Sequence, residues 1–110
     1  MHLALVYWCP HVHQDQTLCF CLSDYALVGH VMETTAVMKE IQCPFKCLAI
    51  DGCTSINYYP MASHSNGNRI CELNNKTRQM KPGDFKKKKG SIYYGSAEVG
   101  VLFFGLIYIN

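Results

Sequence analysis

The chain has 110 residues, of which 49% are hydrophobic and 16% are charged. This composition is enough for one domain with a modest core and excludes a wholly disordered chain. Apolar side chains gather near both ends, yet no run reaches the roughly 20 residues that a membrane-spanning helix needs. Seven cysteines are far above ordinary usage, which predicts either a disulfide framework or a metal site.

The net charge of +2 conceals a strong asymmetry. Residues 76–89 contain seven basic residues and one acid, Asp84, which gives +6, whereas the rest of the chain has three basic and seven acidic residues, which gives −4. A segment this basic predicts a polyanionic partner. The alternative hypothesis is a solvated surface that serves solubility alone. The basic residues of the segment are Lys76, Arg78, Lys81, Lys86, Lys87, Lys88 and Lys89.

The two chain ends are expected to lie outside the domain, which is predicted over residues 22–96. Residues 1–21 form an N-terminal segment, and its apolar start suggests part of a signal peptide, although no basic region precedes it. Residues 97–110 form a hydrophobic C-terminal tail that is too short to cross a bilayer. Membrane attachment stays open only if this tail belongs to a longer span.

The first half of the domain is predicted to contain a strand and then a helix. Residues 26–32 are apolar and rich in β-branched side chains, which favours a strand. A helix is expected to begin near Gln42, because Pro44 is tolerated in a first turn. It should run for about ten residues to a stop at Gly52.

The second half is predicted to supply further strands over residues 54–59, 70–73 and 91–94. Lys86 to Lys89 are expected in a loop or straddling both faces of an edge strand, because four consecutive lysines cannot face one way. One helix among about four strands indicates a small α+β domain. The residues expected to be most buried are Ile41, Phe45, Leu48, Ile56, Tyr58, Leu73 and Tyr93.

The cysteine spacing favours disulfides over zinc. Structural zinc sites use two close cysteine pairs, whereas this chain has one C-x-C and one C-x3-C. Cys43 and Cys47 lie on one face of the expected helix, so each can link the helix to a different strand. A nested pairing, in which Cys53 bonds Cys47 and Cys71 bonds Cys43, fits the distance that each helix cysteine must cover to its strand. No metal site is predicted, and the odd total leaves at least one thiol outside these bridges.

No constellation of catalytic residues is present. The sequence lacks a Gly-rich phosphate loop, an H-E-x-x-H motif and a nucleophile elbow, so a non-catalytic chain without a cofactor is predicted. His30 is expected to be a structural, hydrogen-bonding histidine. The run Cys9-Pro10-His11-Val12-His13 has donors for a soft metal but too few groups to define a site. Asn75-Lys76-Thr77 is the one N-glycosylation sequon.

Taken in order, several motifs resemble the PAN/apple domain. They are Tyr25-Ala26-Leu27-x-Gly29-His30-Val31, Gln42-Cys43-x3-Cys47-Leu48, Cys53-x-Ser55-Ile56-Asn57-Tyr58, Cys71-Glu72-Leu73-Asn74 and Gly90-x2-Tyr93-Tyr94. The set covers about residues 22–95 and is similar to the four-cysteine form found in cnidarian extracellular multidomain proteins.

The resemblance implies an α+β fold in which a small antiparallel sheet cradles one short helix. It implies two disulfides, Cys43–Cys71 and Cys47–Cys53. It also implies a secreted, non-catalytic recognition module for protein or carbohydrate ligands. A heparin-like sulfated glycan would then bind the basic residues of 76–89, whereas nucleic acid is not expected to reach a secreted domain. The alternative function is a structural or tethering domain of a larger extracellular or membrane-attached protein.

Overall fold

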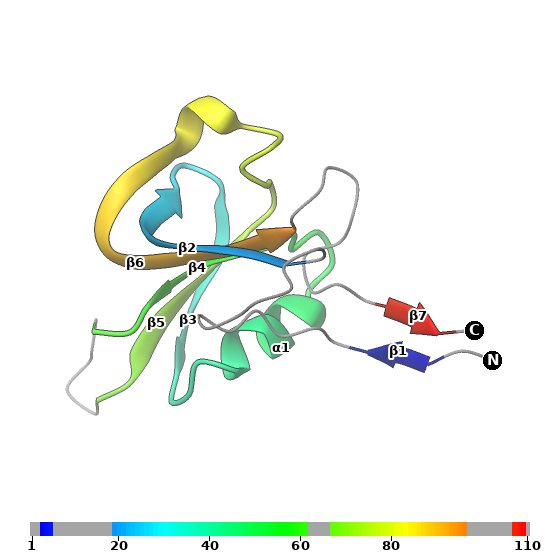
Figure 1. The fold of residues 1–110 in the computed structure, drawn as a ribbon. Helices are drawn as coiled ribbons and strands as arrows, with labels where there is room; N and C mark the ends of the chain where they lie inside the picture. The colour runs from blue at the N-terminus through cyan, green and yellow to red at the C-terminus, as the bar shows by residue number, and fades with distance from the viewer. Residues whose placement is uncertain (1–2, 6–18, 62–66, 97–106, 110) are drawn as a thin grey trace.

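The computed structural model describes residues 3–5, 19–61, 67–96 and 107–109. Within these residues, a five-stranded antiparallel sheet has the strand order β2-β6-β4-β5-β3, and one α-helix lies on one face of it (Figure 1). The elements are β1 (Leu3–Leu5), β2 (Cys19–Leu27), β3 (Val31–Val37), α1 (Gln42–Leu48), β4 (Ser55–Tyr59), β5 (Arg69–Asn74), the 3-10 helix η1 (Pro82–Asp84), β6 (Phe85–Ser96) and β7 (Ile107–Ile109). β1 and β7 pair with each other in a separate antiparallel ribbon.

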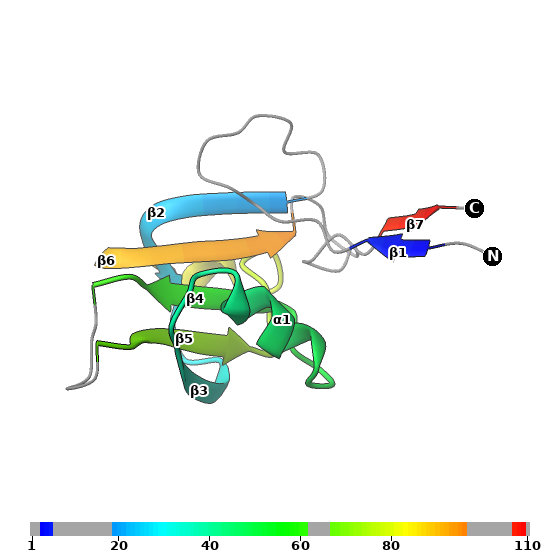
Figure 2. The ribbon, with the colours of Figure 1, turned by 90° about the horizontal axis from the view of Figure 1, so that it is seen from below.

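The predicted α+β fold is therefore confirmed. α1 packs against β4 and β5 on one side of the sheet (Figure 2), whereas the segment that contains η1 lies on the other side (Figure 1). Among the described residues, no helix has the length and apolar character that crossing a membrane requires.

The central strand β4 is buried on both of its faces. Ile56 and Tyr58 belong to the core beneath α1, whereas Ser55 and Asn57 alternate with them and are equally inaccessible. Side chains therefore pack against both faces of this strand, and neither face is exposed to solvent. The core under α1 consists of Val37, Cys43, Cys47, Ile56, Tyr58, Cys71, Leu73, Ile92 and Tyr94.

The prediction of one strand over residues 26–32 is wrong. β2 ends at Leu27 and β3 begins at Val31, and these two strands form opposite edges of the sheet. Gly29 has a φ of +89°, in the left-handed region that favours glycine, and it lets the chain leave one edge for the other. The side chain of Asn57 accepts from the Leu27 backbone N–H at 3.0 Å and donates to its carbonyl at 2.9 Å. The crossover is thus tied to the centre of the sheet, a long-range contact that local composition does not reveal.

The helix is shorter than predicted, with seven residues, and it buries a different face. Its buried residues are Cys43, Pro44 and Cys47, whereas Phe45 is 53% exposed. The predicted core residues Ile41 and Leu48 are only half-buried. The cysteines decide the orientation: residue 45 lies about 200° around the helix from residue 43, so the face that carries Cys43 to the sheet turns Phe45 outward. The predicted burial of Ile56, Tyr58, Leu73 and Tyr93 is confirmed.

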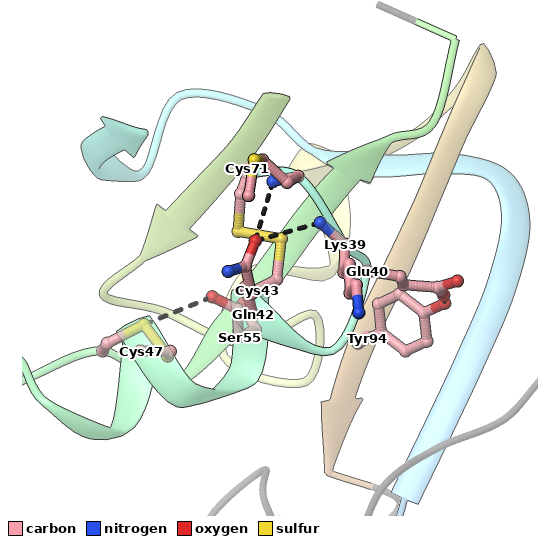
Figure 3. Close-up of a disulfide and its surroundings, with 10 residues drawn as sticks. Lys39, Glu40, Gln42, Cys43, Cys47, Ser55, Cys71 and Tyr94 are labelled. Atoms are coloured by element: carbon pink, nitrogen blue, oxygen red, sulfur yellow. Dashed lines mark hydrogen bonds between the residues drawn. A yellow bond between two sulfur atoms is a disulfide. The ribbon is translucent and has the colours of Figure 1, made fainter. Parts of the chain in front are cut away.

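The structure contains the two disulfides that the spacing and the resemblance implied (Figure 3). Cys43–Cys71 links α1 to β5, with 5.8 Å between the Cα atoms. Cys47–Cys53 links the end of α1 to the segment before β4, with 5.3 Å between the Cα atoms. Both separations lie in the ordinary range for a disulfide.

Hydrogen bonds hold the turn that leads into α1. The Gln42 side-chain carbonyl accepts from the backbone N–H groups of Met38 and Lys39, at 2.7 and 2.9 Å. The guanidinium of Arg69, in β5, donates to the Met38 carbonyl at 2.7 Å. The hydroxyl of Tyr94, in β6, donates to the carboxylate of Glu40 (Figure 3). The helix start is therefore anchored to two strands besides its disulfides.

Candidate anion-binding surface

The basic segment spans a turn, η1 and the first half of β6. It leaves β5, passes over the face of the sheet opposite α1 and returns along the strongly curved β6 (Figure 1). The predicted basic residues are thus spread along one continuous arc of the chain.

Two of the seven predicted ligand residues, Lys76 and Arg78, are half-buried and belong to the turn that follows β5. Arg78 is half-buried: its guanidinium lies 3.8 Å from the centre of the Phe20 ring, and its backbone N–H donates to the Tyr93 hydroxyl at 2.9 Å. Lys76 is also half-buried, and its carbonyl accepts from the Ser55 hydroxyl at 2.6 Å. These contacts anchor the turn after β5 onto β4 and β6.

The other five basic residues are exposed and form what we call the lysine arc: Lys81, Lys86, Lys87, Lys88 and Lys89. Within the described residues, no carboxylate forms an ion pair with any lysine of the arc. Their ammonium groups are consequently available to an external anion.

Lysines 86–89 lie in β6 and not in a loop. Lys86 and Lys87 pair with Ala26 and Tyr25 of β2, while β4 pairs only with the later residues 92–94 of β6. The lysine half of β6 therefore has a single neighbouring strand. Because side chains alternate along a strand, successive lysines project to opposite sides of it.

A bulge separates the two halves of β6. Gly90 has a φ of +89°, its N–H donates to the Asp24 carboxylate at 2.9 Å, and Asp24 itself has a φ of +65°. The Ser91 hydroxyl lies within hydrogen-bond distance of the Tyr25 and Lys88 carbonyls, at 2.7 and 2.8 Å. This bulge bends β6 so that the ring of Phe85 comes within 4.9 Å of the ring of Tyr93, although both belong to one strand.

An aromatic layer supports the bent strand from beneath. The Tyr25 and Phe85 rings stack with their centres 5.2 Å apart. Phe85 meets the buried ring of Tyr93 edge-on, and Tyr93 meets Phe20 with centres 6.3 Å apart. The lysine arc therefore rests on a packed second core, which holds its backbone in place.

The side chain of Lys88 contacts an aromatic ring of β4. Its ammonium group lies 5.1 Å from the centre of the Tyr59 ring. The Tyr59 hydroxyl donates to the Glu72 carboxylate at 2.9 Å, and the Asn57 amide donates to the same oxygen at 3.0 Å. Burial, then the charge of Glu72 and this hydrogen bond, raise the pKa of Tyr59. Tyr59 is therefore neutral and acts as a hydrogen-bond donor at physiological pH.

His30 makes the structural hydrogen bond that was predicted for it. Its Nε2 atom lies 2.8 Å from the Asp84 carboxylate, and its carbonyl accepts from the Asn75 N–H at 3.1 Å. The hydrogen bond to His30, followed in effect by the charges of His30, Lys86 and Lys81, lowers the pKa of Asp84. Asp84 is therefore ionised at neutral pH, within the basic segment.

The sequon asparagine, Asn75, is exposed just after β5. Thr77, the third residue of the sequon, is largely buried, and its hydroxyl accepts from the Met80 N–H at 3.3 Å. Among the described residues, no group of three or more His, Cys, Asp or Glu side chains is arranged to hold a metal. The run from Cys9 to His13 lies outside the described residues.

Two features were missed by sequence reasoning. One is the layer of packing opposite α1, whose rings come from β2 and from distant parts of β6. The other is a shallow surface hollow on α1, lined by Gln42, Phe45, Lys46 and Ala49. The hollow could not be anticipated while Phe45 was assigned to the core.

A helix linked by two disulfides to a five-stranded antiparallel sheet defines a small, cross-linked α+β domain. A scan against protein-family models matches residues 19–98 to the PAN domain. The chain belongs to the PAN domain family. PAN domains are generally non-catalytic modules that bind proteins or carbohydrates in extracellular proteins. No curated protein matches the chain in a sequence search, and no solved structure matches it.

Proposed function

We propose that this PAN domain is an extracellular recognition module whose lysine arc binds sulfated glycans. The observation that carries the proposal is the set of exposed lysines in β6 and before η1, which have no carboxylate partner among the described residues. These lysines lie in a segment of charge +6, while the rest of the chain has charge −4. Such a separation of charge favours binding of a polyanion at this segment.

The chemistry of the arc favours sulfate groups as the ligand. Lysine ammonium groups are flexible point charges, which suit closely spaced anions of variable geometry, and Arg78 is occupied by Phe20. Disulfides are typical of an oxidising, extracellular environment, where sulfated glycans are abundant and nucleic acid is not expected. The proposed localisation is therefore extracellular.

Asn75 is proposed to carry an N-linked glycan. Its exposed side chain lies in the turn after β5 and leaves room for a large substituent. The glycan would be attached next to Lys76, at the beginning of the basic segment.

The test compares two double variants that remove the same charge. Lys86→Gln/Lys87→Gln alters the arc, whereas Lys39→Gln/Lys46→Gln alters two exposed lysines near and within α1. Affinity for a heparin oligosaccharide should fall about tenfold in the first variant and less than about twofold in the second, since each close charge contact contributes up to about 1 kcal/mol. Equal losses in both variants would show that only net charge matters. An unchanged affinity in both would leave the domain with the alternative role of a structural or tethering unit.

A further inference from the structure

The only acid within the basic segment is held by the only histidine of the described residues. Asp84 lies at the end of η1, between Lys81 and Lys86 along the chain. His30 comes from the crossover between β2 and β3 and reaches Asp84 with its Nε2 atom at 2.8 Å. The His30 side chain is 18% exposed and the Asp84 side chain 46% exposed, so solvent protons reach the pair.

The backbone keeps these two groups together. The Val28 N–H donates to the Asp84 carbonyl at 2.9 Å, and the Asn75 N–H donates to the His30 carbonyl at 3.1 Å. The Asp84 N–H donates in turn to the Lys81 carbonyl at 3.0 Å. These hydrogen bonds connect the crossover to both ends of the turn that begins the basic segment, so the backbones that carry His30 and Asp84 are held next to each other.

Two lysines from different segments act on the pair. Lys81 precedes η1, Lys86 follows it in β6, and both act electrostatically on the Asp84 carboxylate along with His30. With a neutral imidazole, the carboxylate offsets part of the positive field of these two lysines. With a protonated imidazole, the pair has no net charge and the field of the lysine arc increases.

We propose that His30 makes glycan binding by the lysine arc pH-dependent, with protonation of the imidazole strengthening the binding of sulfated polyanions. The inference rests on the proposed function of the same surface. Between about pH 5.5 and 7.5, lysines and sulfate groups keep their charge, so histidine is the side chain whose charge changes.

The experiment measures the affinity of the full chain for a heparin oligosaccharide at about pH 7.5 and about pH 5.5, at one fixed ionic strength. The wild-type affinity should rise about two- to fivefold at the lower pH, the effect of one added charge near the ligand. His30→Gln should abolish this rise, because the amide can bond Asp84 but does not titrate. The Asp84→Asn variant should bind the heparin oligosaccharide more tightly than the wild type does at the higher pH, because the carboxylate charge is removed. This variant tests the same pair through the aspartate. His64→Gln, which changes a histidine outside the described residues, is the matched control and should keep the rise.

The outcomes separate the two proposals. Binding that is equal at both pH values, or a rise that survives in His30→Gln, overturns the role of His30 and leaves glycan binding intact. Loss of the rise in His64→Gln assigns the effect to another histidine and also overturns it. An absence of heparin binding by the wild type at either pH contradicts the proposed function itself, and the inference falls with it.

Discussion

Asn57 is a buried polar residue that holds three elements together. From the central strand β4, its amide bonds both backbone groups of Leu27 at the end of β2 and the Glu72 carboxylate of β5. Leu27 is 1% exposed, so its N–H and C=O have no access to water if these bonds are lost. Asn57 therefore satisfies both buried backbone groups at the start of the crossover.

We predict that Asn57→Ala lowers the free energy of unfolding by about 3 kcal/mol, since each stranded buried group costs about 1–3 kcal/mol. Urea denaturation of the oxidised protein measures this loss. Asn75→Ala, which changes an exposed asparagine, is the control and should cost less than about 0.5 kcal/mol. A similar loss in both variants would contradict the assigned role of Asn57.

Tyr59 makes the stability of the domain depend on pH in the alkaline range. Its pKa in the folded state is raised by burial, by the charge of Glu72 and by the hydrogen bond to Glu72. Because the folded-state pKa lies above the unfolded value of about 10, the contribution of Tyr59 is complete below about pH 10 and is lost progressively as the pH rises from there toward the folded-state pKa.

Tyr59→Phe should therefore lower the free energy of unfolding by about 1–2 kcal/mol at neutral pH, the loss of a hydrogen bond to a charged acceptor. The difference between wild type and variant should shrink above about pH 10. Denaturant titrations at a series of pH values test this. A difference that stays constant or grows at alkaline pH would show that Tyr59 ionises as easily in the folded state.

At the scale of elements, the two disulfides close loops of very different length. Cys43–Cys71 spans 28 residues in sequence and Cys47–Cys53 spans 6. A cross-link restricts the unfolded chain more when its loop is longer, and the chain-entropy relation gives about 3.6 kcal/mol for the first and about 2.2 kcal/mol for the second.

Replacing both cysteines of one bridge by alanine should thus cost about 1 kcal/mol more for Cys43/Cys71 than for Cys47/Cys53. Thermal or denaturant unfolding of the two double variants compares them directly. A greater loss from the shorter bridge would mean that packing around α1 outweighs the entropy of the unfolded chain.

The orientation of α1 can be tested at Phe45, which the helix exposes to solvent. Phe45 is 53% exposed, whereas Ile56 in β4 is fully buried. Phe45→Ala should change the free energy of unfolding by less than about 0.5 kcal/mol, and Ile56→Ala should cost about 2–5 kcal/mol. If Phe45→Ala is as destabilising as Ile56→Ala, the helix face described by the structure is incorrect.

At the scale of the whole molecule, the parts predicted from sequence are those set by local pattern. Cys43 and Cys47 are four residues apart, which predicts a helix with two cross-links on one face. The alternation of apolar and polar residues around Ile56 and Leu73 predicts buried strands. These features follow from helix and strand periodicity, which is visible within a single segment of the sequence.

The parts that escaped prediction depend on contacts between distant residues. The break at Gly29 is stabilised by Asn57, which is 28 residues later in the chain. The bend in β6 depends on Asp24 contacting Gly90, and the burial of Arg78 depends on Phe20. Charge alone placed all seven basic residues in one candidate surface, whereas the structure divides them into five exposed lysines and two anchors.

The central proposal is that the lysine arc binds sulfated glycans through its charge. Binding driven by the release of counterions weakens linearly on a plot of log affinity against log salt, with a slope of about 0.7–0.9 for each neutralised anion. The number of lysines in contact with the ligand can therefore be read from the slope.

The most direct measurement is the heparin affinity of the wild type and of a variant with Lys86, Lys87, Lys88 and Lys89 all changed to glutamine, across a sodium chloride series. The magnitude of the slope should fall by about 3 in the variant, as expected for four lost contacts. The far-ultraviolet circular dichroism spectrum should remain unchanged, because all four side chains are exposed. An unchanged affinity and slope would contradict the proposal and show that these lysines form a solvated surface without a ligand.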